Sequence, residues 1–412
     1  MKILMLTPYV TIDGNPKFER NKTGFGYMVM DIAKAVGKLE DVEVLATDTR
    51  GEEFETAGVK FLKRSLPSYI LNLFSCLPLR SLIRLRKEYR MSKRTFVRVA
   101  YYWLMTGYLC KLIKKNKYDI VHIHGCGFFT ELWMQVCEHC GQKYIVTLHG
   151  LNSFSDTVRL ELAGKQYERD FLHRVAKGDI PITVISSGMK HIIEKTYGVK
   201  DCPNIKVVCN SFSFGDDSNK GGKSQLIRQL YGIENNSIIL LCVGNIGKRK
   251  NQGQLITAFS LLPADLAERT YILFCGGNQE QDYTIETLSR DSEWKNHFIA
   301  CGVVPKESID AYYEQCDAVA LMSLSEGFGL SLIEGMHFGK PSISFTDVDA
   351  FEDIYNPVAM IGVEQHSDEA VAAGLERLLA TTWDSNKIKQ CSEQFESQTM
   401  AKNYIDVYQR II

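Results

Sequence analysis

Short apolar runs alternate with helical patterns from one end of the sequence to the other. This alternation is typical of parallel sheets covered on both faces, because crossover helices shield each side of the sheet from water. It predicts an α/β protein with two doubly wound units in series. The expected strands are Lys2–Leu6, Val42–Ala46, Ile120–His124, Tyr144–Leu148, Ile182–Ile185, Ile238–Val243, Tyr271–Cys275 and Ala318–Met322.

The helical repeats support the same arrangement and suggest where the domains divide. We expect helices over Tyr27–Leu39, Leu255–Leu262 and Leu330–Phe338, and a further helix from Met189 to a cap near Gly198. A polar, glycine-rich stretch at 211–223 has the character of a linker. We therefore predict a first domain over 1–205 and a second over 206–391, with a C-terminal helix at about 392–412 packing back on the first.

Composition excludes several classes of protein. A chain of 412 residues with 45% hydrophobic and 24% charged residues is long and apolar enough for two cores, unlike a disordered chain. No stretch approaches the roughly 20 apolar residues of a membrane span. The apolar run that follows Met1 is too short for a signal peptide. The expected location is therefore the cytoplasm.

The 12 cysteines have no framework spacing, and in a reducing compartment they act mostly as small buried apolar residues. One Cys-x-x-Cys motif joins Cys137 and Cys140. A zinc site would need a second ligand pair at similar spacing, and none follows in the sequence. We therefore expect these two cysteines to be a chance cluster on a helix, and no metal.

One segment departs from the neutral average charge. Between Lys63 and Lys117 there are 14 basic residues, opposed by Glu88 alone, with large apolar and aromatic side chains between them. This combination favours contact with an anionic membrane, where each basic residue contributes about 1 kcal/mol. An ordinary solvated helix face is the alternative, and nucleic acid is not favoured, because no stacking or groove-reading motif accompanies the charge.

The stretch Ser325–Pro341 carries the most chemical information. It follows an expected strand and consists of a glycine-containing turn and a helix that begins near Leu330. Gly327 and Gly329 allow backbone N–H groups to approach a ligand, and the helix N-terminus adds partial positive charge, which suits phosphate or sugar oxygens. Glu326 can project at the carboxyl end of the sheet, and a carboxylate one turn inside the helix can accept a hydroxyl pair.

Two glutamates eight residues apart would mean little alone, but the frame of Glu326-Gly-Phe-Gly-Leu and Glu334-Gly resembles the Glu-x7-Glu signature of family 4 retaining glycosyltransferases. The resemblance implies the GT-B fold, in which two Rossmann-like domains face a central cleft. Further segments are similar to family motifs in order along the chain: Thr23–Gly26, Ile120–Gly125, Thr147–Gly150, Val207–Asn210, Val243–Asn251 and Cys301–Val304.

The resemblance also implies roles. Glu326 would meet the donor sugar hydroxyls, Glu334 the ribose and Lys250 the leaving diphosphate, while His149 would lie at the reacting sugar and the acceptor. Asn245 replaces the arginine usual in the family, so the missing charge is expected from Lys248 or Arg249. The remaining implied donor-binding residues are Gly24, Gly26, Lys248, Arg249, Val304, Phe328, Gly329 and Leu330.

The resemblance implies a metal-independent retaining hexosyltransferase without a cofactor. It would use a nucleotide-sugar donor, most often linked to uridine diphosphate (UDP), and a lipid-linked or glycan acceptor of envelope or capsular polysaccharide synthesis. It would lie at the inner face of the membrane. Asp347-Val-Asp349 is expected to be a solvated acidic loop near the donor, not a metal site. A nucleotide-sugar epimerase of the same fold and a catalytically silent sugar-binding protein remain as alternatives.

Overall fold

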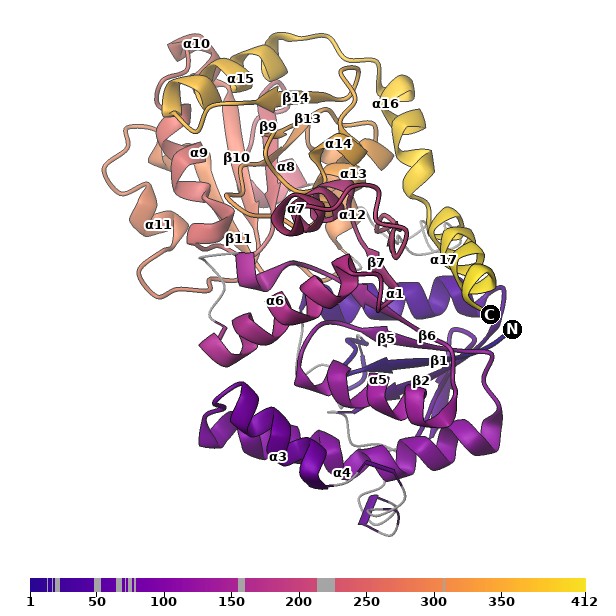
Figure 1. Cartoon of the computed structure of the whole chain (residues 1–412). Coiled ribbons are helices and arrows are strands. Elements are labelled where there is room, and N and C mark those ends of the chain that lie inside the picture. The colour runs from indigo at the N-terminus through magenta and orange to yellow at the C-terminus, as the bar shows by residue number, and fades with distance from the viewer. Residues whose placement is uncertain are drawn as a thin grey trace. The chain divides into compact units, whose positions relative to one another are not determined.

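The strands predicted from the apolar runs assemble into two sheets, one in each of two units of the chain (Figure 1). The first unit comprises Met1–Asn210 and Ser397–Ile412, and the second comprises Ser211–Glu396. The computed structural model describes the 412 residues except 13, 17, 19–22, 48–52, 64–68, 71, 73–75, 78, 155–159, 213–226 and 307. Most of the predicted linker at 211–223 lies outside the described residues.

The sheet of the first unit has the order β3-β4-β2-β1-β5-β6-β7-β8 within the described residues. Its neighbours are parallel except for the antiparallel pair β3 and β4. The central strands are fully buried, as their apolar runs require. The strands are β1 Lys2–Thr7, β2 Asp41–Ala46, β3 Phe54–Thr56, β4 Val59–Phe61, β5 Ile120–His124, β6 Tyr144–Leu148, β7 Ile182–Val184 and β8 Ile205–Val207.

Helices cover both faces of this sheet, with α1 beside α17 and α4 beside α5 (Figure 1). The C-terminal helix α17 is held to the first unit by Tyr408, whose hydroxyl lies 2.7 Å from Nδ1 of the buried His122. The helices are α1 Gly24–Gly37, α3 Leu79–Glu88, α4 Lys93–Asn116, α5 Phe128–Cys140, α6 Leu162–Ala176, α7 Ser187–Tyr197 and α17 Ser397–Ile411, with the 3-10 turn η1 at Asn152–Phe154.

The second sheet is parallel throughout and has the order β11-β10-β9-β12-β13-β14. The predicted strand at 318–322 ends one residue earlier, and the strand at 238–243 has the predicted bounds. The strands are β9 Ile238–Val243, β10 Thr270–Cys275, β11 Phe298–Gly302, β12 Ala318–Leu321, β13 Ser342–Phe345 and β14 Met360–Val363.

Two apolar clusters, one on each face of the second sheet, form its core. One cluster includes Leu255 and Phe259 of α9 with Leu375 of α15, and the other includes Tyr312 and Tyr313 of α12. The helices are α8 Ile227–Tyr231, α9 Gln252–Phe259, α10 Ala264–Glu268, α11 Ile285–Leu288, α12 Ile309–Gln315, α13 Leu330–His337, α14 Phe351–Ile354, α15 Asp368–Ala380 and α16 Ser385–Ser392, with 3-10 turns η3 Lys248–Lys250, η4 Lys295–His297 and η5 Glu393–Phe395.

Capping explains where the predicted helix boundaries hold and where they shift. Helix α7 ends at Gly198, whose φ of +66° is the left-handed conformation predicted for its cap. The helix predicted over Tyr27–Leu39 begins three residues earlier, because the Thr23 hydroxyl accepts a hydrogen bond from the Gly26 N–H and caps the helix there. Among the described residues, no helix combines the length and the apolar character that a membrane crossing requires.

Candidate functional site

The second sheet changes direction between β9 and β12. The chain proceeds from β9 to β10 and β11 on one side, then returns to place β12 against the other side of β9. Loops that leave the carboxyl ends of these two strands diverge at such a point and leave a crevice that binds ligands in open α/β sheets. The loop after β9 contains Lys250, and the loop after β12 contains Glu326.

These two loops meet through a cluster of one carboxylate and two cations. The Glu326 carboxylate accepts hydrogen bonds from Lys250 Nζ and, at 3.4 Å, from Arg249 Nη1. Arg249 also donates to the Ser325 carbonyl oxygen at 2.6 Å, and the Ser323 hydroxyl lies 3.4 Å from the Glu326 carboxylate. The structure therefore brings together Lys250 and Glu326, both of which the sequence predicts at the donor site.

The cluster is largely shielded from solvent, and each of its side chains keeps part of its surface exposed. The side chains of Lys250 and Glu326 are 14% and 16% exposed, and that of Arg249 is 31% exposed. Burial raises the pKa of Glu326, but the charges of Lys250 and then Arg249 outweigh burial and hold that pKa below its ordinary value. Glu326 is consequently ionised at neutral pH, and the three groups together carry one net positive charge.

Asn245 carries no positive charge, and the surroundings of Lys248 and Arg249 show which of these two cations can replace it. Asn245 is exposed, and its carbonyl oxygen accepts a hydrogen bond from Gln252 at 3.1 Å. Lys248 is 74% exposed and lies 3.7 Å from Glu280, away from Glu326. Arg249, and not Lys248, is the second cation beside Lys250.

The turn after β12 places backbone groups at the start of helix α13. Gly329 occupies the N-cap position with a φ of +85°, which a side chain would strain. Phe328 is buried, with its ring 5.9 Å from that of Phe395. Phe328 therefore serves the core with its side chain, and the ligand-binding role predicted for it, for Gly329 and for Leu330 rests on the backbone at the helix N-terminus.

Glu334 lies one turn into α13 and has a protein partner. Its carboxylate accepts a hydrogen bond of 2.6 Å from the hydroxyl of Tyr313, a buried residue of α12. Burial and then the Glu334 charge raise the Tyr313 pKa well above its ordinary value, so the phenol stays protonated and donates. Tyr313 therefore positions Glu334. Val304, also predicted at the donor site, is partly buried against the cluster that contains Tyr313.

The loop after β13 brings a second carboxylate near Glu326. The Asp349 N–H donates to the Glu326 carbonyl oxygen at 3.3 Å, and burial, with the charges of Glu326 and Asp347, raises the Asp349 pKa to about 6. Asp347 is 64% exposed and lies 2.9 Å from His366 Nε2. The two aspartates therefore differ, and the prediction of a wholly solvated acidic loop is wrong for Asp349, because the β13 loop folds inward against the Glu326 turn.

The first sheet changes direction in the same way between β1 and β5. Here the carboxyl ends carry imidazoles. His149, directly after β6, lies with Nε2 3.2 Å from Nδ1 of His124, the last residue of β5. The ring of Phe25 in α1 packs edge-on against His149, with 4.9 Å between centroids. The histidines of two neighbouring strands are thus gathered beside the start of α1.

These imidazoles are neutral at physiological pH. Burial lowers the pKa of His149 to about 3, and burial with the neighbouring histidines lowers the pKa of His124 well below its ordinary value. The His124 Nε2 atom is buried without a hydrogen-bond partner in the described structure. His149 can therefore act as a neutral hydrogen-bonding group but not as a standing cation.

The two predicted phosphate-loop glycines of α1 differ in their surroundings. A Cβ at Gly26 would collide with Thr11, whose N–H donates to the Gly26 carbonyl oxygen at 3.1 Å. A Cβ at Gly24 would meet open space. Gly26 is required by close packing, and Gly24 leaves the N-terminal end of α1 accessible.

The basic segment forms helices α3 and α4, with cations on their exposed faces. Leu82 and Leu85 are buried, while Leu79 and Ile83 are 55% and 43% exposed on the same helix as the exposed basic residues. Arg64, which was counted in this segment, lies outside the described residues. The exposed basic side chains of the two helices include Arg80, Arg84, Arg86, Lys87, Lys93, Arg94, Lys111, Lys114 and Lys115.

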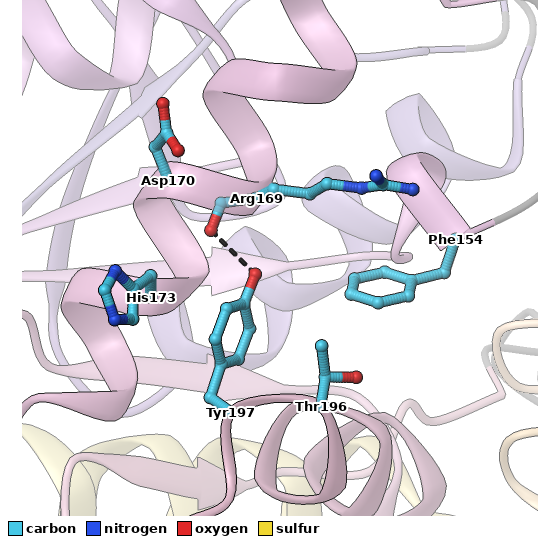
Figure 2. Close-up of a pocket in the computed structure, with 6 residues that line it drawn as sticks. All are labelled: Phe154, Arg169, Asp170, His173, Thr196 and Tyr197. Carbon is cyan, nitrogen blue, oxygen red and sulfur yellow. Dashed lines mark hydrogen bonds between the residues drawn. The ribbon is translucent and has the colours of Figure 1, made fainter.

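A hollow of about 490 Å³ lies on the first unit beside α6 and α7 (Figure 2). In it the Tyr197 hydroxyl donates to the Arg169 carbonyl oxygen at 2.7 Å, and the Tyr197 ring stacks on His173. None of the residues predicted for the active site lines it. The lining residues are Phe154, Arg169, Asp170, His173, Thr196 and Tyr197.

Within each unit, the structure brings several of the predicted residues to the carboxyl ends of the strands where the strand order reverses, which we call the crevice edge of the sheet. Lys250, Arg249 and Glu326 meet in the second unit, and His149 lies beside the α1 start in the first. Sequence reasoning missed the inward position of Asp349, although its Asp-x-Asp spacing drew attention to the loop. It also missed His124 as the partner of His149, for which the alternating His-x-His of β5 was the available signal.

Comparison with known proteins agrees with this arrangement. Residues 23–212 match the model of the family described as Glycosyltransferase Family 4, and residues 223–396 match that of Glycosyl transferases group 1. An uncharacterised glycosyltransferase of Methanocaldococcus jannaschii is 22% identical over 71% of this chain and 75% of its own length. The alpha-monoglucosyldiacylglycerol synthase of Acholeplasma laidlawii is 23% identical over 58% of this chain and 62% of its own length.

Solved structures share the fold over the whole chain. The Anabaena protein HepE, in a complex with UDP-glucose, superposes with a TM-score of 0.65 at 15% identity and covers 100% of both chains. The two family models together span nearly the whole sequence, and both sheets have the doubly wound order of the fold. The chain is a family 4 glycosyltransferase with the GT-B fold.

Proposed function

We propose that this glycosyltransferase transfers a hexose, with retention at the anomeric carbon and without a metal ion, from a nucleotide-diphosphate sugar to a membrane-associated or glycan acceptor. UDP is the proposed carrier. The observation that carries the proposal is the meeting of Lys250 and Arg249 at Glu326, on the switch point of the second sheet. A diphosphate needs positive charge at such a point, and this cluster supplies it from the protein.

The cations act on the leaving group. As the bond between the sugar and the phosphate breaks, negative charge grows on the nucleoside diphosphate. Lys250 and Arg249 would stabilise this charge, and the amides at the start of α13 would add hydrogen bonds and the helix dipole. In some enzymes a bound metal ion stabilises such a charge. We propose that these side chains and backbone amides do so here, so that the reaction needs no metal ion.

Glu326 has two partners in turn. In the structure its carboxylate accepts hydrogen bonds from Lys250 and Arg249. With donor bound, the diphosphate would compete for these cations, and the carboxylate would turn to the sugar hydroxyls. Because no second carboxylate is proposed on the opposite side of the anomeric carbon, the route is front-face transfer in which the leaving phosphate takes the acceptor proton.

His149 and Glu334 would complete donor binding. A neutral imidazole suits a hydrogen bond to a sugar hydroxyl, because it adds no charge that would compete with the diphosphate for the cations. Glu334, held by Tyr313 at 2.6 Å, is proposed to accept the ribose hydroxyls with its remaining lone pairs. Gly24 would let the start of α1 approach the phosphate side.

The acceptor is proposed to lie at an anionic membrane. The exposed face of α3 combines arginines with Leu79 and Ile83, which suits a lipid surface better than solvent alone. The name of the Acholeplasma relative, a glucosyldiacylglycerol synthase, supports a lipid acceptor. We propose a role in envelope or capsular polysaccharide synthesis at the inner face of the membrane.

The test combines donor binding with turnover. A panel of UDP- and GDP-sugars should raise the melting temperature for one donor, and Lys250→Ala should lower turnover of that donor by about 100- to 1000-fold. Lys295→Ala, which removes an exposed lysine of the same unit, is the control and should leave turnover unchanged. Unchanged turnover in Lys250→Ala would refute the assignment.

Membership of a glycosyltransferase family disfavours the epimerase and the silent sugar-binding protein. Incubation of donor without acceptor separates all three. A transferase hydrolyses the donor slowly with release of free sugar, an epimerase isomerises it, and a silent protein leaves it intact.

A further inference from the structure

Three thiols and one imidazole gather in the first unit, at the edge opposite the imidazoles beside α1. Cys110 lies on the buried side of α4, His139 and Cys140 end α5, and Cys76 belongs to the segment that leads into α3. His149 follows the carboxyl end of β6, whereas Cys140 precedes its amino end. The cluster is therefore separated from the proposed active site by the length of a strand.

Cys140 is placed by its contact with Cys110, and the other three side chains form a group of their own. The Sγ atoms of Cys110 and Cys140 are 3.2 Å apart. The ligating atoms of Cys76, Cys110 and His139 all lie within 4.8 Å of one another, and this is the group of metal-ligating type found in the part of the chain that the structure describes. Tetrahedral zinc, with bonds of about 2.0–2.3 Å, places its ligand atoms about 3.5–3.8 Å apart.

We propose that Cys76, Cys110, His139 and Cys140 bind one Zn²⁺ ion in a structural, four-coordinate site. Thiolate and imidazole together are the ligands that zinc prefers, and three thiolates with one imidazole make a closed set without an open position. The spacing of the cysteines in the sequence does not predict this site. The Cys-x-x-Cys motif contributes Cys140 but not Cys137, whose side chain is fully buried, and the other cysteines come from distant segments.

The charges balance with help from a neighbour. Zinc displaces one proton from each thiol, and three thiolates around a divalent ion leave one net negative charge. The Lys114 ammonium lies near Cys76 and Cys140 and offsets this remaining charge of the loaded site.

The site would hold the basic segment in place. Helices α4 and α5 pack side by side (Figure 1). The Sγ atoms of Cys110 on α4 and Cys140 on α5 lie 3.2 Å apart. Cys76 adds the segment that leads into α3, the helix that carries the exposed arginines. Zinc would thus connect Cys76, which precedes the basic helix α3, to helices α4 and α5. The entropic cost of closing the chain between these ligands is modest, because it grows slowly with loop length. The inference rests on the fold and not on the proposed sugar transfer.

The experiment measures metal on the full chain purified with a reductant. Elemental analysis should find about one Zn²⁺ per chain, and Co²⁺ added to the chelator-treated protein should give the absorption bands of tetrahedral thiolate coordination. Cys76→Ser and His139→Asn should each weaken zinc binding at least about 10-fold. Both side chains lie at half-buried or exposed positions, so the variants should fold, which circular dichroism verifies.

Cys391→Ser is the matched control, because Cys391 is a half-buried cysteine of the second unit, and its zinc content should equal that of the wild type. The proposal is overturned if the reduced wild type binds no Zn²⁺ or Co²⁺. It is also overturned if both cluster variants bind as the control does. A Cys110–Cys140 disulfide in protein prepared with a reductant, found by mass spectrometry, would likewise overturn it.

Discussion

The crevice edges of the two sheets have the same topology and opposite chemistry. In the second unit, the loops after β9 and β12 gather Lys250, Arg249 and Glu326, which are charged and paired. In the first unit, the strands β5 and β6 end in His124 and His149, which burial keeps neutral. The carboxyl ends of the second sheet therefore carry fixed charges. Those of the first sheet carry hydrogen-bonding groups without charge.

The difference shows that strand order fixes the place of a site and the loop residues fix its chemistry. A doubly wound sheet opens a crevice wherever its order reverses, whatever the side chains are. For a reaction that separates charge, a charged edge suits the leaving diphosphate, and a neutral edge suits the hydroxyl groups of a sugar. Four predictions sharpen or break this comparison.

The largest effect is expected from Glu326→Gln, which keeps the shape of the side chain and removes its charge. Turnover should fall by about 10- to 150-fold, because a charged hydrogen bond is worth about 1.5–3 kcal/mol. Binding of the free nucleoside diphosphate should become tighter, since Lys250 and Arg249 lose the carboxylate that competes for them. Steady-state rates and calorimetric titration measure the two quantities.

Glu280→Gln is the control for this variant, because Glu280 is a partly exposed carboxylate of the same unit that lies 3.7 Å from the Lys248 ammonium. It should change neither quantity. If Glu326→Gln weakened diphosphate binding, the competition between carboxylate and diphosphate would be disproved, and the charged edge would need another explanation.

The two glycines at the start of α1 differ in their surroundings, and Gly26→Ala tests the packing of the first unit. A Cβ at Gly26 would collide with Thr11, so the variant should lose about 1–3 kcal/mol of unfolding free energy. Gly24→Ala meets open space at the start of the same helix and should be neutral or stabilise by up to about 1 kcal/mol. Urea unfolding compares the two, and equal losses would contradict the packing argument.

Asp349→Asn tests the charge of the second edge through stability. Burial and two neighbouring carboxylates raise the Asp349 pKa to about 6 in the folded chain, above its value in the unfolded chain. Because the folded chain holds the Asp349 proton more tightly than the unfolded chain, the contribution of Asp349 to the free energy of unfolding is fully present below about pH 4. This contribution is lost as the pH rises through 6. The variant should therefore be more stable than the wild type at pH 7.5, by about 3 kcal/mol.

This gain should shrink toward zero near pH 4, which denaturant unfolding at several pH values would reveal. Asp347→Asn changes an aspartate that is 64% exposed and should show a much smaller dependence on pH. A gain for Asp349→Asn that did not vary between pH 4 and 7.5 would rule out the carboxyl ionisation as its cause.

Much of this comparison could be predicted from the sequence, because strands and motifs are local. The apolar runs at 120–124 and 238–243 gave strands with the predicted bounds, since a buried strand needs only consecutive apolar residues. The start of α1 was placed too late, because Gly24 and Gly26 look like a loop and only the Thr23 cap shows that the helix has begun.

The second cation beside Glu326 could not be predicted. Lys248, Arg249 and Lys250 are consecutive, and the 3-10 turn that they form decides which of them meets Glu326. The zinc ligands proposed here come from 76, 110 and 139–140, and no spacing rule connects them. Local patterns thus identify the elements, and tertiary packing selects the partners.

The smallest effect, and the sharpest test of the neutral edge, is expected in the pH profile of His149 variants. Because burial lowers the His149 pKa to about 3, its imidazole is uncharged across pH 5–8. The wild type and His149→Gln should therefore show the same inflections of kcat/KM over this range, although the variant is slower at every pH. Loss of an inflection near pH 6.5 in the variant would mean that His149 titrates in the working enzyme. The first edge would then carry charge as the second does, and the contrast between the two sheets would disappear.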